Sequence, residues 1–197
     1  MRTACIGTWS LALLLMTSAC GPEAEAVEEP PKCGQPEGAA CDEPDSWPTW
    51  ALEDVQPDSP RFGQTYGLDV FEGKVVFVAY LVGWCGYCQS QTVALEKLRT
   101  ELEADGVDVA FVTVNGVSAD NADDQTALTS RCGFPVLQDT ADVDAWTSGQ
   151  GGKDDFFIYA PDGSLAEYLP PSSGTNLGDD ADYAALKAKI VAVAAAQ

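Results

Sequence analysis

The stretch of sequence that decides the fold runs from Val75 to Leu102 and reads VVFVAYLVGWCGYCQSQTVALEKLRTEL. Its first eight residues are apolar and rich in β-branched side chains, which predicts a strand that is buried on both faces. After the Gly-Trp turn, mostly apolar side chains recur at steps of three and four residues, which predicts an amphipathic helix. Cys85 and Cys88 stand where the turn becomes this helix. The sequence therefore predicts a buried strand that delivers a cysteine pair to the beginning of a helix.

This position of the cysteine pair suits thiol–disulfide exchange. Unpaired backbone N–H groups and the dipole at a helix N-terminus stabilise a thiolate, and a thiolate is the species that attacks a disulfide. The second cysteine of such a pair lies one turn later, is more buried, and can attack the mixed disulfide to release the product. We therefore predict that Cys85 is the nucleophile and that Cys88 is the resolving cysteine, with Trp84 shaping the site.

Two other interpretations of the C-x-x-C pair are half of a zinc site and an inert structural bridge. The chain has no second C-x-x-C and no histidine at all, which weakens the zinc interpretation. A bridge between adjacent turns of one helix would constrain very little of the chain, which weakens the structural one. The place of the pair directly after a buried strand favours redox activity.

The rest of the chain predicts the elements that surround this unit. Their order is β-α-β, an inserted helix–strand–helix, a β-hairpin with a Pro-Asp-Gly turn, and a final Ala-rich helix. This order predicts an α/β three-layer sandwich, in which a central mixed sheet is flanked by helices. The expected elements are a lead-in hairpin within 47–71, a strand at 108–114, a helix at 118–131 capped by Ser118, a strand at 134–139, a short helix at 141–147, hairpin strands at 156–159 and 165–169, and a helix at 180–196.

The N-terminus has the three parts of a secretory signal over residues 1–19, and Cys20 follows its small residues. Thr17-Ser18-Ala19-Cys20 resembles the bacterial lipobox, in which the cysteine is acylated, although Thr17 stands where leucine is usual. Gly21 favours sorting to the outer membrane. We expect an exported protein anchored by lipid at Cys20, on the periplasmic or the surface face. The alternative is ordinary cleavage, with Cys20 as a spare thiol.

Residues 20–60 are predicted to be a tether and lead-in segment, before a folded domain at 61–197. The first part is acidic, rich in proline and without a hydrophobic period, as solvated linkers are. In an oxidising compartment, Cys33 and Cys41 are expected to form a local disulfide. A four-cysteine zinc site of Cys33 and Cys41 with Cys85 and Cys88 is the weaker alternative, because its C-x7-C spacing is loose for zinc.

Composition excludes several classes of function. The chain has 10 basic and 31 acidic residues, a formal charge of −21, and therefore repels nucleic-acid phosphates and anionic headgroups. The absence of histidine excludes Ser–His and Cys–His catalysis. We expect no cofactor and no metal. Cys132 remains either a third redox thiol or, more commonly for such a residue, a small buried apolar side chain.

The Trp84-Cys85-Gly86-Tyr87-Cys88 turn and the element order resemble the thioredoxin superfamily. A closer resemblance is to the N-terminal thioredoxin-like domain of selenoprotein P, whose redox pair has selenocysteine in the first position. The stretches 112–115, 135–136 and 153–159 look like counterparts of that domain, and the run Lys153-Asp154-Asp155-Phe156 is the most specific. The His-rich segments and selenocysteine-rich tail of selenoprotein P have no counterpart in this chain, so selenium transport is not implied.

Thioredoxin-fold enzymes place a cis-proline opposite the nucleophile, before the β-hairpin, and here that position belongs to 153–155. Pro135 is followed by a helix instead. One hypothesis is that Asp154 faces Cys85 and raises the pKa of its thiol. The alternative is that the acids are solvated or cap Lys153.

Three functions compete. The leading one is a thiol–disulfide oxidoreductase that acts on protein thiols or disulfides with a redox donor or acceptor that the sequence does not identify. A second is a thiol peroxidase in which Cys85 attacks a hydroperoxide and Cys88 resolves the sulfenic acid. The peroxiredoxin motif is missing, which ranks it lower. The third is a non-catalytic binding module that keeps the fold and a structural bridge.

Overall fold

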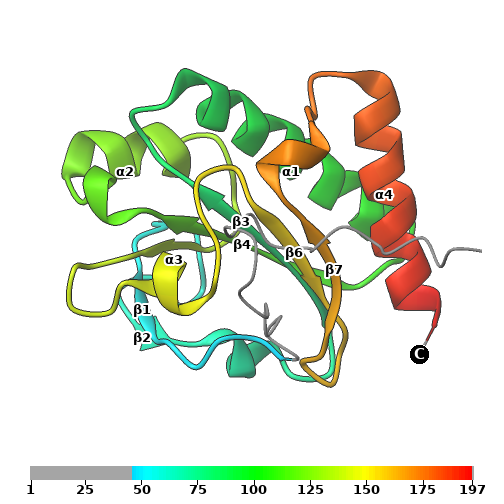
Figure 1. The fold of residues 1–197 in the computed structure, drawn as a ribbon, viewed down its shortest axis with the longest axis horizontal. Coiled ribbons are helices and arrows are strands. Elements are labelled where there is room, and N and C mark those ends of the chain that lie inside the picture. The colour runs from blue at the N-terminus through cyan, green and yellow to red at the C-terminus, as the bar shows by residue number, and fades with distance from the viewer. Residues whose placement is uncertain (1–45, 197) are drawn as a thin grey trace, which may run out of the picture. The chain divides into compact units, whose positions relative to one another are not determined.

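The structure, a computed structural model, describes residues 46–196, which form one mixed sheet with helices on both faces. The sheet has seven strands in the order β2-β1-β5-β4-β3-β6-β7 (Figure 1). The strands are β1 (Leu52–Asp54), β2 (Thr65–Tyr66), β3 (Val75–Leu81), β4 (Val109–Asn115), β5 (Val136–Gln138), β6 (Phe156–Tyr159) and β7 (Leu165–Leu169). The α-helices are α1 (Gly86–Ala104), α2 (Ala122–Thr129), α3 (Ala145–Ser148) and α4 (Asp180–Ala195), and three short 3-10 helices are η1 (Leu68–Phe71), η2 (Val117–Ala119) and η3 (Pro171–Ser173).

Strand β3 lies inside the sheet and is buried along its whole length, as its apolar sequence predicts. It pairs in parallel with β4, where Phe77 lies opposite Phe111, and antiparallel with β6, where Phe77 lies opposite Ile158. Side chains of β3 alternate between the two faces of the sheet, so both faces need cover. The C-terminal end of this strand leads directly into the cysteine pair.

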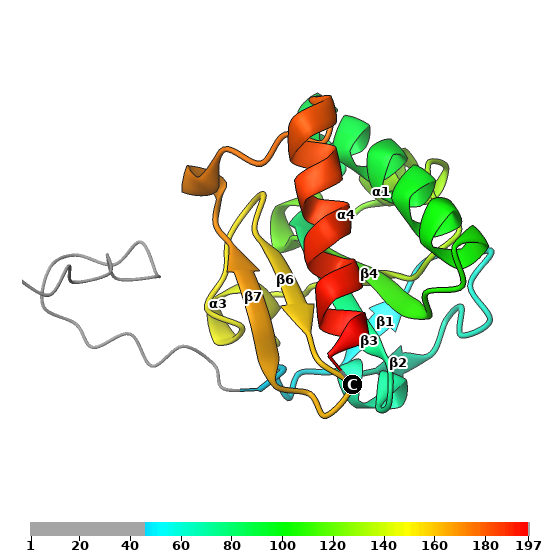
Figure 2. The same ribbon diagram turned by 90° about the vertical axis from the view of Figure 1, so that its right-hand side faces the viewer.

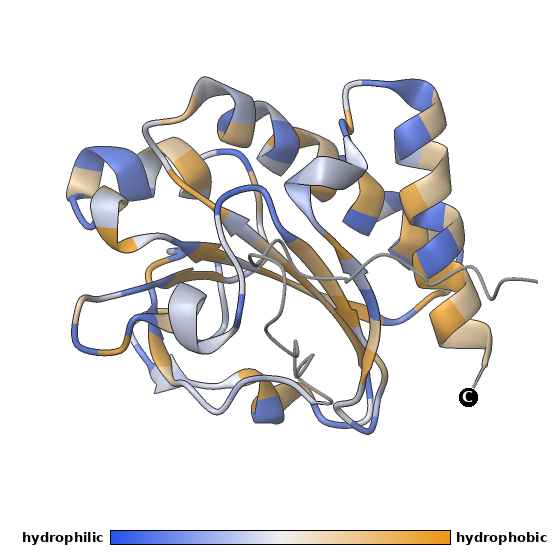
Figure 3. Cartoon of the chain, viewed as in Figure 1, coloured by the Kyte–Doolittle hydropathy of each residue, from blue (hydrophilic) through white to orange (hydrophobic). Residues whose placement is uncertain are grey.

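Helices α1, α2 and α4 cover one face of the sheet, and leucines of all three pack on the Phe77 side of β3. The other face is covered by α3, η1 and the aromatic lead-in around Trp50 and Tyr66. Figures 1 and 2 show α1 and α4 on the same side of the sheet and α3 on the opposite side. Hydrophobic residues concentrate in the central strands and on the sheet-facing sides of the helices (Figure 3). The predicted three-layer α/β sandwich is confirmed.

Two elements differ from the sequence-based prediction. Helix α2 begins after Asn121, whose side chain accepts a hydrogen bond from the Asp124 N–H at 3.0 Å, so Ser118 is not its cap. Strand β5 was expected within an insertion, but it is an interior strand, parallel to β4 and antiparallel to β1. The lead-in hairpin of β1 and β2 therefore extends the sheet itself.

Cys20, Cys33 and Cys41 lie outside the described residues, and so do the signal segment and most of the tether. Their predicted roles stay predictions. Within residues 46–196, none of the helices is long and apolar enough to cross a bilayer.

Candidate active site

The cysteine pair lies at the C-terminal end of β3, at a tight turn that is held by hydrogen bonds to buried groups. The Gly83 N–H donates to the side-chain oxygen of Asn115 at 3.1 Å, and the Cys85 N–H donates to the Val82 carbonyl at 3.2 Å. Asn115 is fully buried and also donates to the Ala119 carbonyl and to Gln138. One buried amide therefore joins the turn to the neighbouring strands and to η2.

Gly83 is required by close packing against α2. A Cβ added at Gly83 would lie 2.0 Å from the backbone oxygen of Asp124, a contact that no side chain can make. Gly86, three residues later, has nothing within 4 Å of the same added atom. The turn can therefore pack against α2 only because residue 83 has no side chain, whereas residue 86 is under no such constraint.

Cys85 is the N-cap residue of α1, and Cys88 lies in its first turn. The Cys85 sulfur accepts a hydrogen bond from the Cys88 backbone N–H at 3.4 Å. Cys85 is half-buried, whereas Cys88 is 0 % exposed and belongs to the core beneath α1. Both are free thiols. The predicted arrangement, an accessible sulfur at a helix N-terminus and a buried sulfur one turn later, is present.

The segment before β6 brings a lysine and an acid to the two sulfurs. The Lys153 ammonium lies 3.8 Å from the Cys85 sulfur and 4.0 Å from the Cys88 sulfur. The Cys88 thiol donates to Oδ1 of Asp154 at 3.2 Å, and Oδ2 of Asp154 is ion-paired with Lys153. The Asp154 N–H donates to the Tyr80 carbonyl at 2.8 Å, which holds this segment beside β3.

The two thiols titrate in opposite directions. Partial burial opposes ionisation of Cys85, but hydrogen bonds from the Cys88 thiol and backbone N–H, the charge of Lys153 and the Tyr87 N–H outweigh it, so the pKa of Cys85 is lowered. Burial raises the pKa of Cys88, and the hydrogen bond to Cys85 and the carboxylate of Asp154 raise it further. A thiolate at this site therefore belongs on Cys85.

The hypothesis that Asp154 faces Cys85 and raises its pKa is wrong. The carboxylate lies against Cys88, and the pKa of Cys85 is lowered, despite partial burial, by hydrogen bonds from Cys88 and by the charge of Lys153. The alternative, in which the acid pairs with Lys153, is confirmed. Sequence reasoning named Lys153 only as the partner of an acid and missed its contact with the sulfurs.

Two aromatic side chains flank the accessible sulfur. Trp84 is 55 % exposed, and its indole N–H donates to the Ser118 hydroxyl at 3.2 Å. Tyr87 is 42 % exposed, and its hydroxyl donates to the Thr175 carbonyl at 3.1 Å. These anchored rings leave apolar surface beside Cys85. The groups that hold the two rings, the Ser118 hydroxyl and the Thr175 carbonyl, are distant in sequence, so these contacts could not be predicted from the sequence.

Cys132 lies apart from this site. It is buried, Gln56 donates to its carbonyl at 2.7 Å, and burial raises the pKa of its thiol to about 12. This fits the interpretation of a small buried side chain. Pro135 precedes β5, and Asp155 directly precedes β6; every peptide bond in the described part of the chain is trans.

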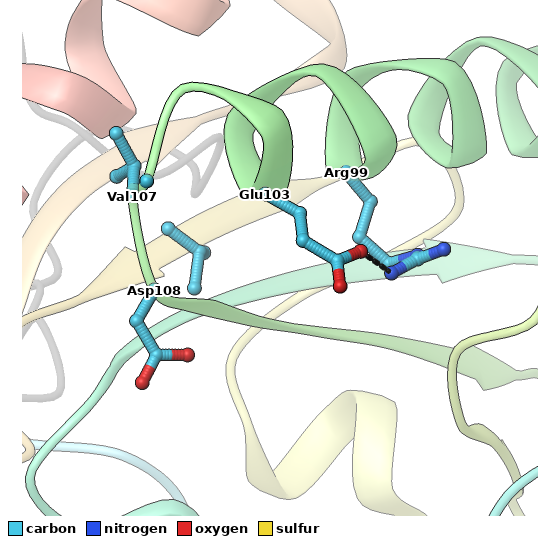
Figure 4. A pocket seen from close by; sticks show the side chains of 6 residues that line it. Arg99, Glu103, Val107 and Asp108 are labelled. Carbon is cyan, nitrogen blue, oxygen red and sulfur yellow. Dashed lines mark hydrogen bonds and ion pairs between the residues drawn. The ribbon is translucent and has the colours of Figure 1, made fainter.

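A surface hollow at the C-terminal end of α1 is remote from the sulfurs. It has a volume of about 370 Å³ and lies between the C-terminal end of α1 and the beginning of β4, at the opposite end of the sheet from the cysteines. Figure 4 shows Arg99 and Glu103 of α1 beside Val107 and Asp108. It contains no thiol. Across residues 46–196, no three His, Cys, Asp or Glu side chains are grouped as metal ligands would be.

The family model for the N-terminal region of selenoprotein P matches residues 36–171 of this chain. The chain belongs to the selenoprotein P N-terminal family. Among its relatives, zebrafish selenoprotein Pa is 30 % identical over 163 residues, which are 81 % of this chain and 38 % of that protein. The chain spans only 27 to 38 % of the length of the selenoprotein P relatives from mouse, zebrafish and human. The predicted resemblance to this family is confirmed.

Solved structures of proteins named as thiol:disulfide interchange proteins share the fold of this selenoprotein P-like domain. A Chlorobium tepidum protein assigned as the thiol:disulfide interchange protein DsbE has a TM-score of 0.61 and 22 % identity, over 79 % of this chain and 99 % of that one. A second protein of that organism, named as a thiol:disulfide interchange protein of the thioredoxin family, has a TM-score of 0.51 and 15 % identity, over 80 % and 99 %. At these identities the likeness shows the fold alone.

Proposed function

We propose that this selenoprotein P-like domain is a thiol–disulfide oxidoreductase that works outside the cytoplasm, with Cys85 as nucleophile and Cys88 as resolving cysteine. One observation carries the proposal. A partly exposed thiol with a lowered pKa caps α1, and a buried thiol with a raised pKa lies one turn behind it. This division supports attack by Cys85 and resolution by Cys88.

The proposed reaction has two steps. The Cys85 thiolate attacks a substrate disulfide, forms a mixed disulfide and releases the first substrate thiol. Cys88 then attacks the Cys85 sulfur, so that a Cys85–Cys88 disulfide forms and the second substrate thiol leaves. The substrate is reduced and the cysteine pair is oxidised; in the reverse direction the pair oxidises a dithiol.

The substrates that we propose are protein thiols or disulfides. Trp84 and Tyr87 offer exposed apolar surface beside Cys85, on which a polypeptide segment can pack. The names of the structurally similar Chlorobium proteins, which are thiol:disulfide interchange proteins, point the same way. The same proposal includes export to the outer membrane and lipid anchoring at Cys20. Export would place the domain in an oxidising compartment, in which a Cys33–Cys41 disulfide can form.

Trapping tests the assignment of the two cysteines. The Cys88→Ser variant cannot resolve, so proteins that react should stay bound to Cys85 as mixed disulfides. Such adducts would be identified by mass spectrometry after non-reducing separation, and a reductant should release them. Cys132→Ser is the matched control, and it should trap nothing more than the wild type does.

The proposal predicts that a Cys85→Ser variant traps nothing. Adducts on Cys88 in that variant would reverse the assigned roles. The absence of any adduct on Cys85 in the Cys88→Ser variant, including with a small reactive disulfide, would contradict the oxidoreductase function.

A further inference from the structure

The buried thiol of Cys88 has two acceptors beside it, the Cys85 sulfur and a carboxylate oxygen of Asp154. Oδ1 of Asp154 lies 3.2 Å from the Cys88 sulfur, in a place where Cys88 itself is 0 % exposed and the Asp154 side chain is 20 % exposed. Two contacts hold the Asp154 carboxylate there. The Asp154 backbone N–H donates a hydrogen bond to the Tyr80 carbonyl of β3, and the second carboxylate oxygen is ion-paired with Lys153.

Backbone geometry also directs this carboxylate. Asp154 has a φ of +72°, in the left-handed region that most residues avoid and that Asp, Asn and Gly tolerate best. Strained backbone of this kind persists where the surrounding structure fixes it, and it gathers at functional sites. Here it lies two residues before β6, and the side chain of Asp154 contacts the Cys88 sulfur.

The resolving step needs a proton acceptor at this point. Cys88 must lose its proton to attack, but a buried thiolate beside a carboxylate is unfavourable, so the proton has to leave as the sulfur–sulfur bond forms. The other titratable groups nearby are Cys85, which is already consumed in the mixed disulfide, Tyr87, Lys153 and Asp155. Lys153 is a cation, and the Asp155 carboxylate accepts from the Gly152 N–H instead.

We propose that Asp154 is the catalytic base of the resolving step, an inference that rests on the proposed function. As the Cys88 sulfur attacks the Cys85 sulfur, its proton passes to Oδ1 of Asp154. The Cys85–Cys88 bond forms, the bond from Cys85 to the substrate sulfur breaks, and the electron pair leaves with the substrate thiolate. Protonated Asp154 then gives its proton to that thiolate or to water. In the reverse direction it protonates Cys88 as the pair is reduced.

Lys153 has a different part in the same cycle. Its ammonium contacts both sulfurs and pairs with Oδ2, so it stabilises the Cys85 thiolate and holds the Asp154 carboxylate in place beside Cys88. The acid should therefore control the second step, and the lysine should control the first. This separation makes the inference testable with two variants of neighbouring residues.

Stopped-flow reduction of dithiodipyridine, a neutral chromophoric disulfide, separates the steps. The first release of thiopyridone reports attack by Cys85, and the second reports resolution by Cys88. Reactions of the other cysteines are subtracted with the full chain that carries Cys85→Ser and Cys88→Ser. Asp154→Asn keeps the shape of the side chain and tolerates the positive φ, so the fold should be retained; Asp154→Gly is a second variant compatible with that φ.

In Asp154→Asn the second phase should slow by at least about tenfold, a modest fraction of what a positioned base contributes. The first phase should not slow, and the Cys85–thiopyridine adduct should accumulate in acid-quenched samples analysed by mass spectrometry. The second phase should also become steeply faster with rising pH, because Cys88 then has to ionise to solvent. Lys153→Gln should show the opposite pattern, with a slower first phase.

Three results would overturn the inference. One is an unchanged second phase in Asp154→Asn. Another is equal slowing of both phases in Asp154→Asn and Asp154→Gly, which would mean that the carboxylate only maintains the site. The last is an unchanged pH profile of the second phase. If the wild type itself releases no Cys85-dependent thiopyridone, the proposed function fails as well, so the two failures are distinguishable.

Discussion

Cys85 and Cys88 are the same residue type, three positions apart, and their surroundings make them different acids. Cys85 receives hydrogen bonds from backbone N–H groups and the charge of Lys153, whereas Cys88 is buried against Asp154. The difference depends on a lysine and an acid that lie more than sixty residues away in the sequence. Electrostatic asymmetry at this site is therefore a product of the fold rather than of the C-x-x-C motif.

Asp155 gives a prediction about pH and stability. Burial raises the pKa of its carboxyl to about 6, although hydrogen bonds from Gly152 and Tyr168 act in the opposite direction. Because the folded-state pKa is above the unfolded value, the favourable contribution of this group is complete below about pH 4 and is lost as the pH rises through about 6.

The Asp155→Asn variant lacks this titration. Its free energy of unfolding relative to the wild type should therefore increase by about 2 to 3 kcal/mol between pH 4 and pH 7. Urea unfolding of both proteins at the two pH values measures the change, whatever the offset from the altered hydrogen bonds. A stability difference that is independent of pH would show that Asp155 is not a buried acid with a raised pKa.

At the scale of elements, β3 and α1 form one unit that places the sulfurs. The strand is buried along its whole length, the turn is fixed by Asn115, and the helix begins at Cys85. Such a unit makes the site sensitive to the close packing of α2 against the turn. In this packing the Asp124 backbone lies close to Gly83.

Gly83→Ala and Gly86→Ala are a matched pair that tests this contact. The first places a Cβ within 2.0 Å of the Asp124 oxygen, so the turn or α2 has to move, and a loss of about 2 to 3 kcal/mol in unfolding free energy is expected. The second meets nothing within 4 Å and removes a glycine from a helix, so stability should stay or rise by up to about 1 kcal/mol. Denaturant unfolding compares the two, and equal effects would contradict the packing account.

The sequence predicts the elements better than it predicts their connections. The continuous apolar run of β3 and the regular face of α1 are local signals, and both are found where they were expected. Asn121 rather than Ser118 caps α2, because two good caps lie three residues apart and packing against the Gly83 turn decides between them. The place of β5 between β1 and β4 depends on long-range pairing, for which a three-residue strand carries no local signal.

The same limit applies to the site. The Cys85–Cys88 pair and the position of Asp154 before the hairpin could be read from the motif and the element order. Which sulfur the carboxylate faces could not, because it depends on the positive φ of Asp154 and on the contact of Lys153 with both thiols. The local sequence pattern identifies the site residues, whereas their contacts with one another depend on the tertiary structure.

At the scale of the whole molecule, membership of the selenoprotein P N-terminal family gives the fold and leaves the activity to be tested. The chain spans about a third of the length of its selenoprotein P relatives, so what those proteins do as a whole does not transfer to it. In the described part of the chain, the two site thiols, Lys153 and Asp154 lie together at the C-terminal end of β3. A chain with this fold and a merely structural cysteine bridge would look similar, except in how readily the bridge is reduced.

An equilibrium redox titration of the full chain tests the central claim most directly. The protein is poised in dithiol buffers, alkylated, and analysed by mass spectrometry at Cys85 and Cys88. The account predicts that both titrate together in one reversible transition with a midpoint between about −270 and −120 mV, where redox-active pairs lie. A midpoint below about −300 mV, typical of structural disulfides, or the absence of any reversible transition would contradict it.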